Sequence, residues 1–163
     1  MGAGYHGGFG NTLGRRLSEN KASKILESDR TNYYSRNEIL RMLDGITPES
    51  TMIVEAIKDG TFRLNILGDK LFDYYVTPDH NVAGRHENGK LYVRRSSADI
   101  VSSILHEGIH AMDYSQGIVY DSIKSELKAY RAEHAFQIAG KRKIEFASDD
   151  EIIVHVYANY GRN

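Results

Sequence analysis

Hydrophobic residues recur with a helical period in the first third of the chain. One such segment covers residues 17–26, and two more follow recognisable helix starts. Ser35 and Glu38 form an S-x-x-E capping box ahead of an apolar run, and Thr47 precedes a proline, which is favoured at the first helical position. Three helices are therefore predicted before Gly60.

The pattern between residues 61 and 95 is typical of strands. Apolar and polar residues alternate over residues 61–67, and residues 71–76 are rich in aromatic side chains, so both segments are predicted to be strands. Residues 82–95 are predicted to form a hairpin, because their Asn88-Gly89 pair is favoured in two-residue turns. These strands would form a small antiparallel or mixed sheet.

Helical periodicity returns after the hairpin, in three segments that each begin at a short polar residue and end at a glycine. Asp99 is expected in the first turn of the first helix, and the third helix is expected to cover residues 149–160. The predicted caps are Ser96 or Ser97, Asp121 or Ser122, and Ser148, and the terminating glycines are Gly117, Gly140 and Gly161. The order of helices, sheet and helices predicts an α+β domain.

The composition is that of one folded domain with a glycine-rich start. The chain has 163 residues, of which 40% are hydrophobic and 26% charged. Six of the first fourteen residues are glycine, so residues 1–16 are predicted to be a flexible linker and residues 17–163 a single domain.

Charge and cysteine content narrow the functional classes. Lys and Arg total 21 against 22 Asp and Glu, and the basic run at residues 141–143 is short, which argues against a nucleic-acid-binding module. The absence of cysteine excludes disulfides and thiolate ligands, so any metal must be bound by His, Asp or Glu. No membrane span or signal peptide is predicted, which leaves the location open between the cytoplasm and export as part of a larger protein.

The main chemical signal is the H-E-x-x-H motif from His106 to His110. Residues four apart share one face of a helix, so the two imidazoles can bind a single ion. Glu107 is rotated away from that face, where its carboxylate can reach a water molecule at the metal rather than the metal itself. The alternative is a pair of helix histidines with only structural roles.

A catalytic zinc site needs a third protein ligand. Glu126 and Glu133 are seven residues apart on the next predicted helix, so both can face the same way, and a short loop suggests that the two helices are antiparallel. Asp113 lies on the metal face of the first helix and could itself be the third ligand, but its short side chain favours orienting a histidine or fixing the helix end.

The segments "HEGIHAMD" and "SELKAYRAE" together resemble the zincin metallopeptidases whose third ligand is a glutamate, including lethal-factor-like and bacterial toxin or effector domains. The resemblance covers residues 71–140 and implies a zincin-like fold with an active-site helix and a glutamate helix. It implies that Glu126 is the third zinc ligand and that Ala129 is the small residue between the helices. The family's later glutamate is displaced by one position onto Glu133, which is expected to contact a histidine.

The resemblance also implies how a substrate would be bound and cut. The strand at residues 89–95 would lie at the edge of the cleft and pair with an extended peptide. Glu107 would act as general base on a zinc-activated water. Tyr120, or else Tyr114 or Tyr130, would stabilise the oxyanion.

The sequence therefore predicts a Zn²⁺-dependent peptidase acting on peptide or protein substrates, either free-standing or as the effector domain of a bacterial toxin. Two other functions are compatible with the same residues. One is a catalytically silent zinc-binding adaptor or sensor, which would have no use for Glu107. The other is a hydrolase of amides that are not peptides.

Overall fold

The computed structural model describes residues 34–161, so the predicted linker and the predicted helix at residues 17–26 lie outside the described residues. The described part contains six helices and three strands. In chain order they are Arg36–Leu43 (α2), Pro48–Lys58 (α3), Arg63–Leu67 (β1), Asp69–Tyr75 (α4), Gly84–Glu87 (β2), Lys90–Arg94 (β3), Ile100–Ser115 (α5), Ser122–Ala139 (α6) and Asp149–Tyr160 (α7). The chain is thus an α+β protein, as predicted.

Four of the helices begin where local capping chemistry predicts. The Ser35 hydroxyl accepts a bond from the Glu38 N–H at 3.2 Å, while the Glu38 carboxylate accepts one from the Ser35 N–H at 2.9 Å. Thr47 caps α3 ahead of its first residue, a proline, and Asp121 and Ser148 cap α6 and α7. These bonds satisfy backbone donors that have no partner within the helix.

The cap predicted for α5 is wrong. The helix starts at Ile100, and its N-cap is Asp99, whose carboxylate accepts from the Ser102 N–H at 3.1 Å. Arg142 binds the same carboxylate, with Nη2 2.8 Å from Oδ1. Ser97 instead has its hydroxyl 3.0 Å from that of Ser103. Burial raises the pKa of Asp99, but the bonds from Arg142 and Ser102 outweigh it and leave the pKa lowered.

The segment at residues 71–76 is helical, which corrects the strand prediction. Helix α4 follows Gly68, and its Phe72 and the following Val76 lie four residues apart, both buried beside Val82. Helical spacing rather than strand alternation puts these two side chains on one face. The Arg94 guanidinium lies 4.3 Å from the centre of the Phe72 ring and fixes the helix to the sheet.

The sheet is mixed, with strand order β1-β3-β2. Strand β1 pairs in parallel with β3, and β2 pairs antiparallel with it. The hairpin turn is as predicted, with Asn88 at φ 49° and Gly89 at φ 77°, the left-handed values that a tight hairpin turn requires. Strand β3 is central, so the prediction that residues 89–95 form the edge strand is wrong. The edge strand that contacts α5 is β2.

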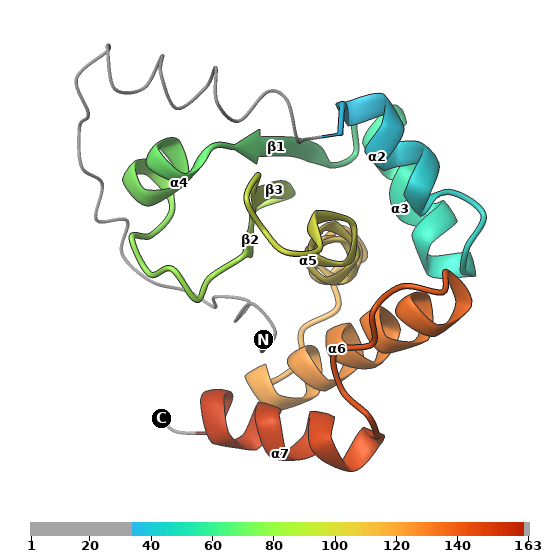
Figure 1. Ribbon diagram of the computed structural model, residues 1–163, viewed down its shortest axis with the longest axis vertical. Helices are drawn as coiled ribbons and strands as arrows, with labels where there is room; N and C mark the ends of the chain where they lie inside the picture. The colour runs from blue at the N-terminus through green and yellow to red at the C-terminus, as the bar shows by residue number, and fades with distance from the viewer. Residues whose placement is uncertain (1–33, 162–163) are drawn as a thin grey trace.

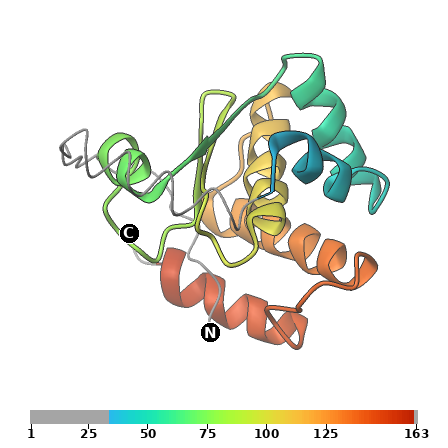
Figure 2. The same cartoon turned by 45° about the horizontal axis from the view of Figure 1, so that its top comes forward.

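Helix α5 runs through the middle of the molecule. It contacts β2 and β3 on one side, α2 and α3 on another, and α6 on a third, with α7 covering the outer side of α6 (Figure 1; Figure 2). Eleven of its residues are buried, and its apolar side chains belong to the main core cluster. In Figure 1 α5 is seen end-on while α6 crosses the view, so the two helices cross at a steep angle. The prediction that they are antiparallel is wrong.

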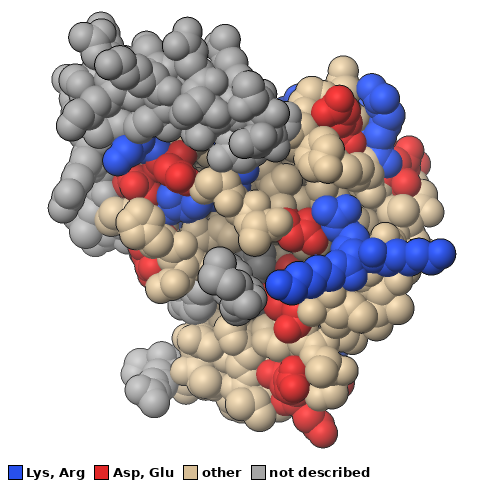
Figure 3. Space-filling view, in the orientation of Figure 1, with Lys and Arg blue, Asp and Glu red and all other residues tan. Residues whose placement is uncertain are grey.

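The surface carries charges of both signs. On the face in Figure 3, basic side chains form an elongated group across the middle, with acidic side chains beside it. No helix in the described part of the chain combines the length and apolar character needed to cross a bilayer.

Helix α3 approaches α5 closely at the glycine inside the H-E-x-x-H motif. A Cβ atom at Gly108 would lie 2.7–2.9 Å from three side-chain atoms of Ile53. The glycine therefore lets the buried helix α5 pack directly against α3.

We predict that Gly108→Ala destabilises the protein by about 1–3 kcal/mol, the usual cost of overpacking a core. This outcome runs against helix propensity, which favours alanine over glycine by about 1 kcal/mol. Urea denaturation measures the change, and shortening Ile53 to valine in the same protein should recover part of it. A Gly108→Ala variant more stable than the wild type would contradict the packing described.

Candidate metal centre

Three side chains from two helices converge at the crossing of α5 and α6. His106 and His110 extend from α5 and Glu126 from α6, and one ligand atom from each lies within 4.8 Å of the others. Glu126 Oε2 is 3.0 Å from His106 Nε2, and Glu126 Oε1 is 3.3 Å from His110 Nε2. The Nε2 atom of each ring thus faces the Glu126 carboxylate.

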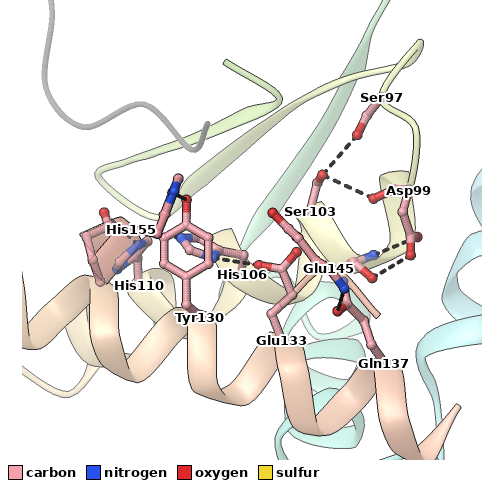
Figure 4. Close-up of polar contacts among 12 residues, drawn as sticks. Ser97, Asp99, Ser103, His106, His110, Tyr130, Glu133, Gln137, Glu145 and His155 are labelled. Carbon is pink, nitrogen blue, oxygen red and sulfur yellow. Dashed lines mark hydrogen bonds and ion pairs between the residues drawn. The ribbon is translucent and has the colours of Figure 1, made fainter. Parts of the chain in front are cut away.

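The other ring nitrogens are bound from behind by α6. Glu133 Oε2 lies 2.9 Å from His106 Nδ1, and the Ser125 hydroxyl lies 3.0 Å from His110 Nδ1. Figure 4 shows Glu133 and His106 pointing toward one another across the two helices. Such partners fix the orientation of an imidazole and make its other nitrogen a better ligand. The sequence predicted the contact of Glu133 with a histidine, but nothing in it indicated Ser125.

A buried aromatic ring supports His106 from a third direction. The Tyr130 ring meets the His106 ring edge to face, with 4.4 Å between centres. The Tyr130 hydroxyl is 3.2 Å from His155 Nε2 (Figure 4). It is also 3.5 Å from the Tyr160 hydroxyl. Burial raises the pKa of Tyr130 far above its usual value. Tyr130 thus packs behind the histidine, with its hydroxyl directed toward two residues of α7.

The charge on Glu126 is compensated within the cluster. Burial raises the pKa of its carboxyl group, but hydrogen bonds and charge interactions with His106 and His110 outweigh burial and lower the pKa well below its usual range. A carboxylate with a lowered pKa stabilises the fold at neutral pH, and this contribution is lost as the pH falls toward the folded-state pKa. Glu126 is therefore ionised at neutral pH, as a metal ligand must be.

An open cavity of about 320 Å³ adjoins the cluster. Its polar lining comes from both helices and from β2, and includes His86, Glu107, His110, Ser125 and Glu126. Its apolar lining comes from the end of α5, the loop before α6 and the end of α7, and includes Tyr114, Ile118, Val119, Tyr120 and Tyr160. The cavity thus brings the predicted base and two predicted ligands to one space with apolar walls.

Glu107 and Tyr120 both reach this cavity, and they differ in burial. Glu107 is 1% exposed, although it lies on the cavity wall, because β2 covers its other side. Tyr120 is 42% exposed, and Lys128 Nζ lies 5.4 Å from the centre of its ring. Tyr114 is also exposed and contacts His86, with 5.3 Å between ring centres.

The expected contact between Asp113 and a histidine is replaced by another. Asp113 is buried, and its Oδ1 forms a short ion pair with Lys128 on α6. The histidine nitrogens have other partners, Glu133, Ser125 and the bridging Glu126.

The donor set could hold a metal ion. Zinc bond lengths of about 2.0–2.2 Å in tetrahedral geometry separate ligand atoms by roughly 3.3–3.6 Å. The two nitrogen–oxygen distances, 3.0 and 3.3 Å, join the two histidines to different oxygens of Glu126, and the three ligand atoms lie within 4.8 Å of one another. Two imidazoles and one carboxylate leave a fourth position for water or substrate, as in catalytic rather than structural zinc sites.

Comparisons of the chain with protein-family models, with curated proteins and with solved structures give no match.

We predict that Glu133→Ala weakens zinc binding by about 10–100-fold, because His106 loses the partner that orients its ring. Asp113→Ala serves as the matched control, since it also removes a buried carboxylate from the α5–α6 interface but does not contact a histidine. Competition with a chromophoric chelator measures both affinities. A larger loss for Asp113→Ala than for Glu133→Ala would contradict the arrangement.

Proposed function

We propose that this protein is a zinc-dependent peptidase in which His106, His110 and Glu126 bind the ion and Glu107 is the general base. The observation that carries this proposal is the convergence of the three donors, with both Nδ1 atoms held by α6, beside the cavity that Glu107 lines. The motif and its surroundings resemble glutamate-type zincins, which supports the same reaction.

A bound zinc ion lowers the pKa of water toward neutrality and polarises a carbonyl group. Glu107 follows His106 directly on α5, so its carboxylate reaches the cavity beside the ligands rather than among them. In the proposed reaction the water oxygen attacks the peptide carbonyl carbon, and Glu107 accepts the proton that water gives up. Glu107 then donates that proton to the amine nitrogen as the carbon–nitrogen bond breaks.

The substrate is proposed to pair with β2, the strand that replaces β3 in this role. The Arg94 N–H donates to the Ala83 carbonyl at 2.8 Å, which makes these two residues a hydrogen-bonded pair of the antiparallel ladder. Alternation along the ladder then turns the backbone groups of Gly84 and His86 toward the outer edge of the sheet. An extended peptide paired there would pass over the cavity beside α5.

Tyr120 is retained as the proposed oxyanion-stabilising residue, because its exposed side chain lines the cavity on the glutamate-helix side. Tyr114 lines the same cavity and is the second choice. A silent zinc-binding adaptor explains the site less well, since it would have no use for a carboxylate on the cavity wall beside the proposed ligands.

We predict that Glu107→Gln keeps the fold and the zinc but lowers peptide hydrolysis by about 10²–10⁴-fold, because an amide cannot accept the proton. Digestion of casein or of a peptide library, with and without chelator, measures the activity. Glu55→Gln, the same change at an exposed position on α3, is the control. Wild-type turnover by Glu107→Gln would exclude Glu107 as the base.

A further inference from the structure

Strand β2 crosses α5 directly above the side chain of Glu107. A Cβ atom built at Gly84 would lie 2.9 Å from Glu107 Cγ, 3.3 Å from Glu107 Oε1 and 3.2 Å from the Tyr92 carbonyl oxygen. A separation of 2.9 Å is well inside the van der Waals contact of two carbon atoms, about 3.5–4.0 Å. Only a residue without a side chain lets the strand and the carboxylate occupy their present positions.

The φ angle gives no reason for glycine at this position. Gly84 is absent from the residues with positive φ in the described part of the chain, so its conformation is open to any L-residue. Glycine weakens the interior of a strand and commonly marks a close approach of another group. Here that group is the side chain of Glu107.

The strand cannot easily move away to make room. Gly84 is in register with Val93 of the central strand, and the Ala83–Arg94 backbone bond lies immediately beside it. Val93 is fully buried in the core cluster that includes the apolar side chains of α5. A side chain at residue 84 would therefore displace the Glu107 carboxylate before it displaced the sheet.

We infer that Gly84 is a positioning residue for Glu107: its missing side chain leaves a slot beneath β2 that holds the carboxylate against the cavity, and any larger residue moves the base out of place. The inference rests on the proposed function for the role of Glu107 as base, but the contact itself does not depend on it. Displacement of a catalytic group by about 1 Å can lower a rate about 10²-fold.

Four zinc-loaded proteins test the contact without any assay of activity: wild type, Gly84→Ala, Glu107→Ala and the double variant. Gly84→Ala is expected to lower the melting temperature by about 3–8 °C in the wild type, as overpacking does. In the Glu107→Ala protein, Gly84→Ala should leave the melting temperature unchanged or raise it. Glu107 Cγ is then absent, and alanine at residue 84 restricts the unfolded chain. An equal decrease in both backgrounds would overturn the inference.

Kinetics then test the positioning role. Gly84→Ala is expected to retain one zinc per chain and nearly unchanged KM while kcat falls at least about 10-fold. In the Glu107→Gln background it should cause no further loss. Gly68→Ala is the control, since its Cβ would meet nothing within 4 Å and its φ is −61°. Wild-type kcat in Gly84→Ala would overturn the inference.

The outcomes separate this inference from the proposed function. If the wild type binds zinc but cleaves no peptide while the melting temperatures remain coupled, the proposed function fails and Gly84 still sets the position of the Glu107 carboxylate. If the wild type cleaves peptides and the melting temperatures are uncoupled, the peptidase stands and the role of Gly84 fails. Should Gly84→Ala not fold, recovery of folding in the double variant supports the contact, and no recovery overturns it.

Discussion

The structure depends on the crossing of α5 and α6, where charged and polar groups are buried in an otherwise apolar core. His106, Glu126 and Glu133 are all buried. Buried ionisable groups are costly unless each has a partner. Here the two glutamates flank one imidazole, so each carboxylate lies within hydrogen-bonding distance of a ring nitrogen. These partners offset the cost of burying the ionisable groups. The packing of the two helices sets the geometry of the cluster.

Small residues allow the main elements to approach α5. Ala129 is fully buried between α5 and α6, and Gly108 lets α3 lie against the motif. Gly84 lets β2 cross above the motif's glutamate. The H-E-x-x-H segment is thus enclosed on three sides by residues whose size, rather than chemistry, fixes its surroundings. The open side is the cavity, which Glu107, His110 and Glu126 line.

Local signals in the sequence were sufficient for the helix caps and the hairpin. Ser35, Thr47 and Ser148 act on residues within one turn of themselves, and the Asn88-Gly89 turn needs only its own two φ angles. The N-cap of α5 was assigned to Ser96 or Ser97 rather than to Asp99, because serine and aspartate have similar N-cap propensities. Helix α4 was mistaken for a strand because aromatic residues favour strands. In the structure Phe72 and Val76 share one face of the helix, and Phe72 contacts Arg94. Arg94 lies far along the chain, so this contact cannot be predicted from the local sequence.

The convergence of side chains at the α5–α6 crossing was predictable as far as spacing along two helices indicates it. His106, His110, Glu126 and Glu133 converge as the i, i+4 and i, i+7 spacings allow. The partner of Asp113, the contact of Ser125 and the central place of β3 depend on the helix crossing and the strand order. These features depend on contacts between residues far apart in the sequence, which no local pattern predicts. The contact of Gly84 with Glu107 is also of this long-range type.

The most direct measurement is the metal content and ligand environment of the protein, obtained by elemental analysis and X-ray absorption after purification without chelators. We expect about one zinc per chain, bound by two imidazole nitrogens and by oxygen at about 2.0–2.2 Å. Glu126→Ala is expected to lose most of the ion while remaining folded. A well-folded wild type that binds no zinc, or a Glu126→Ala variant that binds it as tightly as the wild type, would contradict the account.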